Sequence, residues 1–382
     1  MFTRNKNWTV TLIVIAAVAL GVLAGGRPLA QQPSEPASAQ DKSRVRRTGD
    51  SQPSPSPTPR LKDELPQDSD EVVRVETNLT SIFFTAADKN KRFISTLKKE
   101  DLRVLEDGQA QEIFTFQQNT DLPLSAAILI DCSASEERVM PELKAAARSF
   151  LEAVLRPGKD EAAIVSFTGE VTLEQGFTGS IERLRRAIDR VDFVPPAGYI
   201  GGGIVVGGTP PISDTNQALA GSTAIWDAVW ATSSELLQDS ADNARRAVIL
   251  LTDGEDTSSQ VKMNDSIERA QKADALIYTI GIGDSYNFGI NEGALRKIAE
   301  QTGGRAYFPR SERELREAFA QIQRDLREQY LVAYSPVNKA RDGSYRRTQI
   351  EITDPELRKQ LKLNYRPGYF AKTSAAATPT KK

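Results

Sequence analysis

The sequence predicts an α/β fold, in which a doubly wound, mainly parallel sheet is accompanied by a small antiparallel β-sandwich. Two observations lead to this prediction. Between residues 121 and 329, apolar strand-like runs alternate with helical stretches, which is typical of a parallel sheet covered by helices. Short β-type segments lie on both sides of this region. We therefore expect one α/β domain at 121–329, with flanks at 71–120 and 330–370 that complete the sandwich.

Within the α/β region the expected elements follow in regular order. Strands are expected at 124–131, 161–167, 246–252 and 277–282, with an edge strand at 171–173 and a last one at 305–308. Helices are expected at 136–155, 181–191, 224–237, 265–273, 293–301 and 312–327. The helix at 181–191 places Leu184, Ala187 and Ile188 on one face, which suits packing against a sheet. The stretch 195–221 is rich in Gly and Pro, and loops of that length are usually functional or disordered.

The flanking segments resemble short antiparallel strands. Before the α/β region they cover 72–75, 79–84 and 102–105, and Asp107-Gly108 predicts a hairpin turn with 112–116 as the returning strand. After it they cover 330–334, 345–352 and 361–365. Each flank alone would be marginal, because small units bury too little surface. We therefore expect the two flanks to form one sandwich, followed by a disordered tail at 371–382.

The N-terminal part of the sequence predicts export. Arg4 and Lys6 precede an apolar run at 10–24, so residues 1–30 resemble a secretory signal or an uncleaved anchor that would tether the chain to a membrane. Residues 31–70 are rich in Pro, Ser and charge, which predicts a disordered linker. We expect a periplasmic, cell-surface or secreted protein.

The composition argues against several classes of activity. Among 382 residues, 49 are Lys or Arg and 51 are Asp or Glu, so no overall charge favours nucleic acid. The absence of histidine excludes Ser/His/Asp and Cys/His triads and HExxH zinc sites. Cys132 cannot form an intramolecular disulfide, and we expect it to pack beneath a turn. We do not expect an enzyme.

Oxygen-bearing side chains follow the predicted strands in a pattern that indicates a metal site. Asp131, Ser133 and Ser135 follow one buried strand, Thr223 opens a helix, and Asp253 ends another strand. The carboxyl ends of parallel strands form the usual binding edge of such a sheet, and Mg²⁺ prefers oxygen ligands. A turn with a helix cap is the alternative, because Asp and Ser are common in both.

This pattern resembles the metal-ion-dependent adhesion site (MIDAS) of the von Willebrand factor A domain. The resemblance covers 121–329, with Ala134 where many members have Gly. The segments 99–108 and 329–334 resemble a related exported family that is abundant in acidobacteria. The resemblance implies that the hydroxyls of Ser133, Ser135 and Thr223 bind Mg²⁺ (or Mn²⁺ or Ca²⁺) directly, with one or both of the Asp carboxylates reaching it through water. It also implies an open position for an acidic side chain of a partner.

Nearby acidic residues are expected around the site but not as direct ligands of the metal. Glu255 and Asp256 are expected at the rim of the site, and Asp284 in a loop beside it. The loop at 195–221 is the expected surface for partner specificity.

The sequence leaves three hypotheses for the function. The leading hypothesis is an exported adhesion or protein-interaction module that binds an acidic group of a partner through a divalent cation. The second is a scaffold subunit of an envelope assembly whose metal is mainly structural. A hydrolase is disfavoured, because no general base stands beside the expected ion.

Overall fold

The computed structural model describes residues 79–90, 92–118, 121–195, 199–201, 204–205, 222–241, 244–282 and 289–373. Outside these residues lie the predicted N-terminal segment 1–30, the linker 31–70, the strand 72–75, Asp284, most of the loop 195–221 and most of the tail 371–382. None of the helices in the described ranges is long and apolar enough to cross a membrane.

The α/β region contains a six-stranded sheet with the order β12-β11-β10-β5-β6-β7. Only the edge strand β7 runs antiparallel to its neighbour in this sheet. The strands are β5 (Leu124–Asp131), β6 (Glu161–Phe167), β7 (Val171–Thr178), β10 (Arg245–Thr252), β11 (Ala275–Gly281) and β12 (Ala306–Tyr307). All eight residues of β5 are buried, as expected for a central strand covered on both faces.

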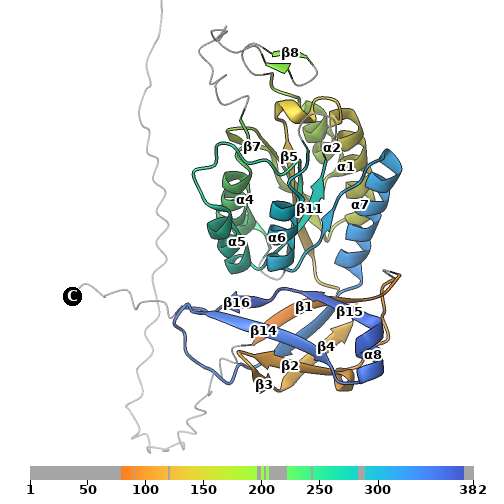
Figure 1. Ribbon diagram of the computed structural model, residues 1–382, viewed down its shortest axis with the longest axis vertical. Helices are drawn as coiled ribbons and strands as arrows, with labels where there is room; N and C mark the ends of the chain where they lie inside the picture. The colour runs from red at the N-terminus through yellow and green to blue at the C-terminus, as the bar shows by residue number, and fades with distance from the viewer. Residues whose placement is uncertain are drawn as a thin grey trace, which may run out of the picture. The chain divides into compact units, whose positions relative to one another are not determined.

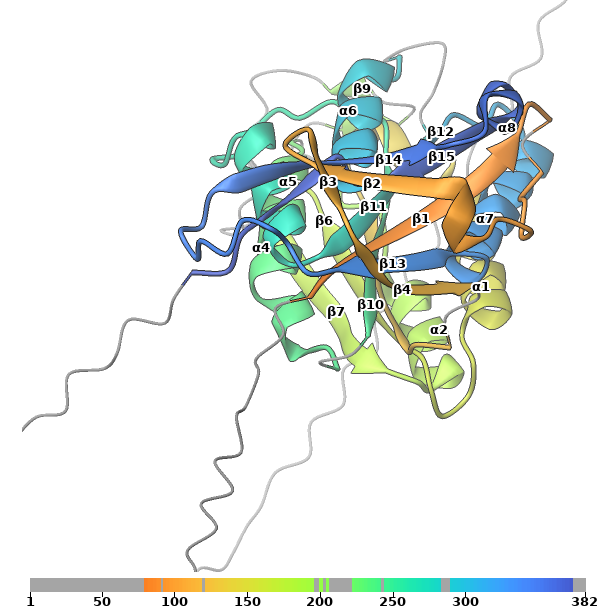
Figure 2. The same cartoon turned by 90° about the horizontal axis from the view of Figure 1, so that it is seen from below.

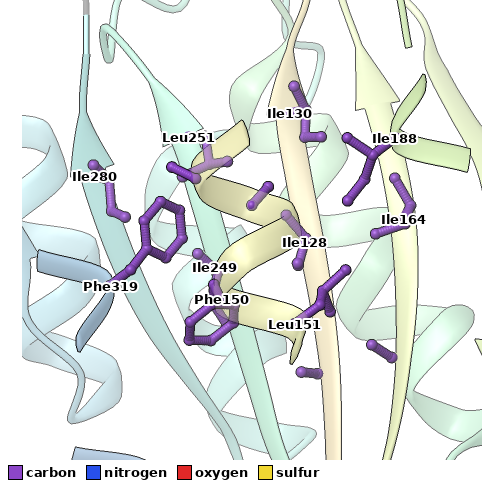
Figure 3. Close-up of a cluster of buried hydrophobic side chains, with 14 of the residues drawn as sticks. Ile128, Ile130, Phe150, Leu151, Ile164, Ile188, Ile249, Leu251, Ile280 and Phe319 are labelled. Carbon is purple, nitrogen blue, oxygen red and sulfur yellow. The ribbon is translucent and has the colours of Figure 1, made fainter. Parts of the chain in front are cut away.

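Helices cover both faces of this sheet (Figure 1). They are α1 (Met140–Val154), α2 (Ile181–Arg190), α4 (Ile225–Ser234), α5 (Met263–Lys272), α6 (Glu292–Thr302) and α7 (Glu312–Arg327). α1, α2 and α7 pack on one face, where Ile164, Ile128 and Ile249 lie side by side on neighbouring strands (Figure 3). α4, α5 and α6 pack on the other face. The predicted doubly wound α/β fold is confirmed.

The flanks form two four-stranded antiparallel sheets, with the orders β15-β1-β13-β4 and β16-β14-β2-β3. Both sheets contribute to one apolar core, in which Phe84 and Val332 of the first sheet join Val104 and Ile350 of the second. Figure 2 shows β2 and β14, one from each flank, lying side by side in this part of the molecule. The strands are β1 (Thr80–Asp88), β2 (Leu102–Glu106), β3 (Gln109–Gln111), β4 (Ile113–Gln118), β13 (Tyr330–Tyr334), β14 (Tyr345–Ile352), β15 (Leu361–Tyr365) and β16 (Gly368–Phe370). The predicted sandwich is confirmed.

The hairpin at Asp107-Gly108 differs from the prediction in its returning strand. Both residues have positive φ angles, 48° and 82°, so the two-residue turn leads directly into β3, where Gln109 pairs with Glu106. The chain then changes sheets, and β4 pairs with β13 instead of β2. The prediction that 112–116 returns along the hairpin is therefore wrong.

Smaller elements complete the described structure. The 3₁₀ helices are η1 (Lys99–Asp101), η2 (Ala134–Glu136) and η3 (Leu236–Asp239), and a short helix α8 (Pro355–Gln360) precedes β15. Two short strands, β8 (Tyr199–Gly201) and β9 (Ile204–Val205), pair within the loop 195–221. The helix predicted from residue 136 starts later, at Met140, with Pro141 in its first turn, where the missing N–H of proline costs nothing.

Candidate metal centre

Asp131 ends the central strand β5 and is fixed from two sides. Its Oδ1 accepts a hydrogen bond of 2.9 Å from the backbone N–H of Ser133, which closes a tight turn after the strand. Its Oδ2 accepts a 2.6 Å hydrogen bond from the hydroxyl of Thr252, at the end of the neighbouring strand β10. Asp131 is fully buried. The parallel pairing of β5 and β10 thus determines the orientation of this carboxyl group.

The two serine hydroxyls of the first loop link Asp131 to Asp253. The Oγ atoms of Ser133 and Ser135 lie 3.1 Å apart. The Ser133 side chain lies close enough to Asp131, and the Ser135 side chain close enough to Asp253, to lower the pKa of that aspartate. Four of the five residues predicted from the sequence therefore meet through their side chains.

Asp253 occupies the loop that follows β10. Its Oδ1 accepts a 2.9 Å hydrogen bond from the N–H of Glu255, and its side chain is buried. Gly254 allows the turn between them, because its φ is +86° and a Cβ there would lie 2.9 Å from Cγ of Leu295. Asn291 N–H donates to the Asp253 carbonyl at 2.9 Å, which ties the loop to the start of α6.

Thr223, the fifth predicted residue, is joined to the same loop through its backbone. Its N–H donates to Oγ1 of Thr257 at 2.8 Å, and its carbonyl accepts from the N–H groups of Thr257 and Ser258 at 2.9 and 3.1 Å. Thr223 is buried. The segment that starts at Asp253 therefore determines the position of the Thr223 backbone.

Asp256 holds the start of α4, immediately after Thr223. Its Oδ1 accepts hydrogen bonds from the N–H of Ile225 at 2.8 Å and from the hydroxyl of Ser259 at 2.5 Å. Ala224, at the N-cap position, has no side chain that could perform this task. The sequence predicted Asp256 at the rim of the site, and in the structure its side chain holds the start of α4. Glu255 is exposed.

Glu136 is a further carboxylate that the sequence analysis missed. Its carboxyl group, with those of Asp131 and Asp253, supplies three oxygens that lie within 4.8 Å of one another. Glu136 is 0% exposed. The expected helix start at 136 assigned this residue to an ordinary first turn, where acidic residues are common. Pro141 was the available signal, because it favours a later helix start and leaves Glu136 in the loop.

Burial raises the pKa of each of these carboxyl groups. The pKa of Asp131 rises to about 7, mainly because of burial and then because of the nearby charge of Asp253. Burial also raises the pKa of Asp253, and that of Glu136 well above its usual range. No basic side chain of the described residues is among the main influences on the three pKa values. Within the described ranges, the negative charge of the cluster is therefore not offset by a nearby Lys or Arg as a main influence.

The chemistry and spacing of this cluster fit a divalent metal ion. Every donor is an oxygen, which suits Mg²⁺, Mn²⁺ or Ca²⁺. Oxygens on opposite sides of one Mg²⁺ are about 4 Å apart, and those around one Ca²⁺ about 5 Å. The three carboxylate oxygens fall within this range, since none is more than 4.8 Å from another. One ion could therefore contact all three.

Cys132 lies within the first loop but does not belong to the cluster. Its side chain is 2% exposed, and Sγ is 3.6 Å from the carbonyl oxygen of Ile130. Burial, together with the charge of Asp131, raises the pKa of the thiol. Because only the thiolate is a good nucleophile, this cysteine is unreactive. The predicted packing role of Cys132 is confirmed.

The doubly wound sheet carries its oxygen-rich cluster at the carboxyl ends of the strands, which is the usual binding edge of an open α/β domain. The chain contains a von Willebrand factor type A domain: two sequence models with this description match residues 126–255 and 211–321. No curated protein matches the chain. The more specific resemblance to the acidobacterial family stays a prediction.

Solved structures similar to this chain include two of proximal thread matrix protein 1 from the mussel byssus. One is 19% identical, covers 58% of this chain and 51% of its own, and has a TM-score of 0.43. The other, with a zinc-occupied MIDAS motif, is 15% identical, covers 55% and 49%, and has a TM-score of 0.41. A von Willebrand factor type A protein from Catenulispora acidiphila is 16% identical, covers 77% and 73%, and has a TM-score of 0.43. The chain spans about half the length of the mussel protein. The domain assignment rests on the sequence models and the sheet topology.

Proposed function

We propose that this protein is an exported interaction module that binds an acidic group of a partner protein through a divalent cation. Asp131, Ser133, Ser135, Thr223 and Asp253 would hold the cation. The observation that carries the proposal is the buried group of carboxyls and hydroxyls at the carboxyl edge of the sheet, where no basic side chain of the described ranges is a main counter-charge for the acidic groups.

The cluster can act as an adhesion site because the ion would supply the attraction that the protein surface lacks. The protein as a whole has a formal net charge of only −2, so long-range attraction contributes little. A cation at the sheet edge would be the strongest local charge, and a partner carboxylate would gain a charge-assisted contact with it. The loop at 195–221 is the proposed source of specificity.

We propose no catalytic role for this site. The protein has no histidine. The three carboxyl groups are buried within 4.8 Å of one another, where they would face the proposed ion, so none is free to act as a general base on a substrate. We expect the ion to hold a partner without cleaving it.

Calorimetric titration of the purified full-length chain with Mg²⁺, Mn²⁺ and Ca²⁺ tests the metal claim. We expect binding with one ion per chain, and loss of that binding in Asp131→Ala. Asp121→Ala is the matched control, because the Asp121 side chain is 83% exposed and precedes the opposite end of β5. No binding by the wild-type chain, or unchanged binding in Asp131→Ala, would rule out the site.

The second candidate is a scaffold subunit of an envelope assembly with a mainly structural metal. The observation that favours it is the sandwich, in which β1 from one flank pairs with β13 and β15 from the other. Copurification of partners in Mg²⁺, followed by a chelator wash, separates the two functions. Release of the partners supports the adhesion module, whereas their retention supports the scaffold.

A further inference from the structure

Glu136 distinguishes this cluster from one built on Asp131 and Asp253 alone. It is fully buried, and one of its carboxylate oxygens lies within 4.8 Å of oxygens from both aspartates. Neither of its oxygens forms a hydrogen bond to a described residue, although the backbone N–H of Asp253 is close enough to oppose the rise in its pKa. A buried carboxylate without a partner is strongly unfavourable. In the part of the chain that the structure describes, no positively charged side chain is a main influence on Glu136.

The backbone around Glu136 holds the side chain in the cluster. Residues 134–136 form the 3₁₀ turn η2, in which Glu136 N–H donates to the Ser133 carbonyl at 3.0 Å. The Glu136 carbonyl in turn accepts from Val139 N–H at 3.1 Å. α1 begins only at Met140, so Glu136 belongs to the same loop as Ser133 and Ser135. The backbone of this loop, and not helix α1, therefore determines the position of Glu136.

Ordinary structural roles for Glu136 do not fit. A helix cap would accept hydrogen bonds from the first N–H groups of α1, but the start of α1 has no side-chain cap and the Glu136 oxygens accept none. An ion pair would need a nearby Lys or Arg. The main influences on the pKa of Glu136 are instead burial and the charges of Asp131 and Asp253. Exposure to water is excluded, because the residue is 0% exposed.

We propose that Glu136 is a ligand of the cation, supplied by the chain itself, that occupies a position otherwise open to a partner carboxylate. This inference rests on the proposed function, because it concerns the same ion. With three carboxylates around one divalent ion, the site has a formal charge of −1 in place of zero. Additional negative ligands strengthen cation binding. They also weaken the attraction for an acidic partner, which would have to displace Glu136.

The first test measures binding of Mn²⁺ alone to the full-length chain. We expect Glu136→Gln, which keeps the shape but removes the charge, to lower the affinity for Mn²⁺ by roughly 10- to 100-fold. Glu142→Gln is the matched control, because Glu142 is exposed in the first turn of α1, and we expect it to leave the affinity unchanged. Glu136→Asp keeps the charge, but its shorter side chain withdraws the carboxylate oxygen from the ion. Its affinity for Mn²⁺ should therefore lie between those of the wild-type chain and Glu136→Gln. It also provides a second variant if Glu136→Gln folds poorly.

Thermal unfolding distinguishes a ligand from a residue needed only for packing. In EDTA, Glu136→Gln should raise the melting temperature, because it removes an unbalanced buried carboxyl group. In saturating Mn²⁺ it should lower the melting temperature, because the ion is held less tightly. A packing residue would lower the melting temperature under both conditions, and that result would overturn the proposal.

The competition with a partner is tested with acetate as a carboxylate probe. Acetate that replaces a water on protein-bound Mn²⁺ lowers the water-proton relaxation enhancement, measured with protein in excess over Mn²⁺. We expect Glu136→Gln to respond at lower acetate concentrations than the wild-type chain. Equal responses would overturn the claim that Glu136 occupies the partner position.

The outcomes for the two proposals can be separated. If the wild-type chain binds no Mn²⁺, the proposed function fails, and the role of Glu136 fails with it. If wild-type binding is lost in Asp131→Ala but is unchanged in Glu136→Gln, the proposed function stands and the role of Glu136 is overturned.

Discussion

Thr252 is the residue that most directly controls Asp131. Its hydroxyl donates to Oδ2 of Asp131 at 2.6 Å and accepts from the N–H of Gly254 at 3.1 Å. It therefore links the carboxyl group of the first loop to the turn that carries Asp253. Thr252 is fully buried at the end of β10, so this link is shielded from water.

Replacement of Thr252 by Val should weaken metal binding without unfolding the protein. The side-chain shape is kept, but Asp131 loses the hydrogen bond that orients it, so we expect the affinity for Mn²⁺ to fall about tenfold or more. Calorimetric titration measures the change. Thr172→Val, at an exposed position of β7, is the control. An unchanged affinity in Thr252→Val would show that the orientation of Asp131 does not matter for the ion.

The raised pKa of Asp131 predicts how the metal-free protein responds to pH. The folded pKa of about 7 exceeds the usual value of 3.8, so the folded state binds the proton more tightly than the unfolded state. This stabilisation is fully present below about pH 4 and is lost as the pH rises through 7. The difference corresponds to at most about 4 kcal/mol.

Denaturant unfolding of the wild-type chain and of Asp131→Asn in EDTA, between pH 5 and pH 8, measures this effect. The wild type should lose stability relative to the variant as the pH rises. Because the ion requires deprotonated carboxylates, stabilisation by Mg²⁺ should grow over the same range. A constant difference between the two proteins would contradict the raised pKa.

The residue pattern predicted the positions of the site only where the motif was local or followed a strand. Asp131, Ser133 and Ser135 lie in one short segment, and Asp253 directly follows a clear apolar strand. Glu136 was missed because its role depends on where α1 begins. Thr252 was missed because its role depends on the register of β5 and β10, which the sequence does not state. That the five predicted residues bind a metal stays a prediction.

At the scale of elements, the start of α4 depends on a loop distant in sequence. Asp256 and Ser259 accept from the first N–H groups of α4, and Asp227 accepts from the N–H groups of Gln260 and Val261 at 3.0 and 2.8 Å. The helix and the loop that follows Asp253 are thus joined by hydrogen bonds in both directions. The position of Thr223 depends on both.

Asp256→Ala should therefore reduce both stability and metal affinity. Loss of the cap at α4 should cost about 1 kcal/mol, and the displaced Thr223 should weaken Mn²⁺ binding several-fold. Asp256→Asn should restore most of both, because an amide oxygen can still accept. Asp354→Ala is the matched control, since Asp354 caps α8 in the sandwich. Urea unfolding and calorimetry measure the two effects, and an equal loss of affinity in the control would contradict this assignment.

The sequence predicted elements correctly where apolar periodicity was strong. It failed where pairing between strands distant in sequence determined the structure. The α7 helix begins and ends where the sequence indicated, because its apolar face is regular. By contrast, the change of sheet after β3 follows from the shared core of the sandwich, to which Ile113 contributes from β4. No local signal at that position identifies the partner strand.

At the scale of the whole molecule, the α/β domain is an insertion between two neighbouring strands of the sandwich. Gln118, the last residue of β4, pairs with Tyr330, the first residue of β13. The two ends of the insertion are therefore close together, as in independently folding inserted domains.

Residues 121–329 should consequently fold as a separate protein, with an affinity for Mn²⁺ within a few-fold of the full chain. Residues 71–120 should not fold alone, because β1, β2 and β4 pair with strands from the other flank. Circular dichroism and cooperative thermal unfolding distinguish these outcomes. Non-cooperative unfolding of the 121–329 fragment would show that the sandwich is required for the α/β domain.

The pairing of β1 with β13 has a mechanical consequence. Their five paired positions run from Thr80 opposite Tyr334 to Phe84 opposite Tyr330. The preceding chain joins β1 at Thr80, and the α/β domain joins β13 at Tyr330, so the two attachment points are at opposite ends of the ladder. Tension between the N-terminal part of the chain and a partner held at the cation would pull these strands lengthwise past each other. The hydrogen bonds between β1 and β13 would then share the force, and would not open one after another as in a zipper.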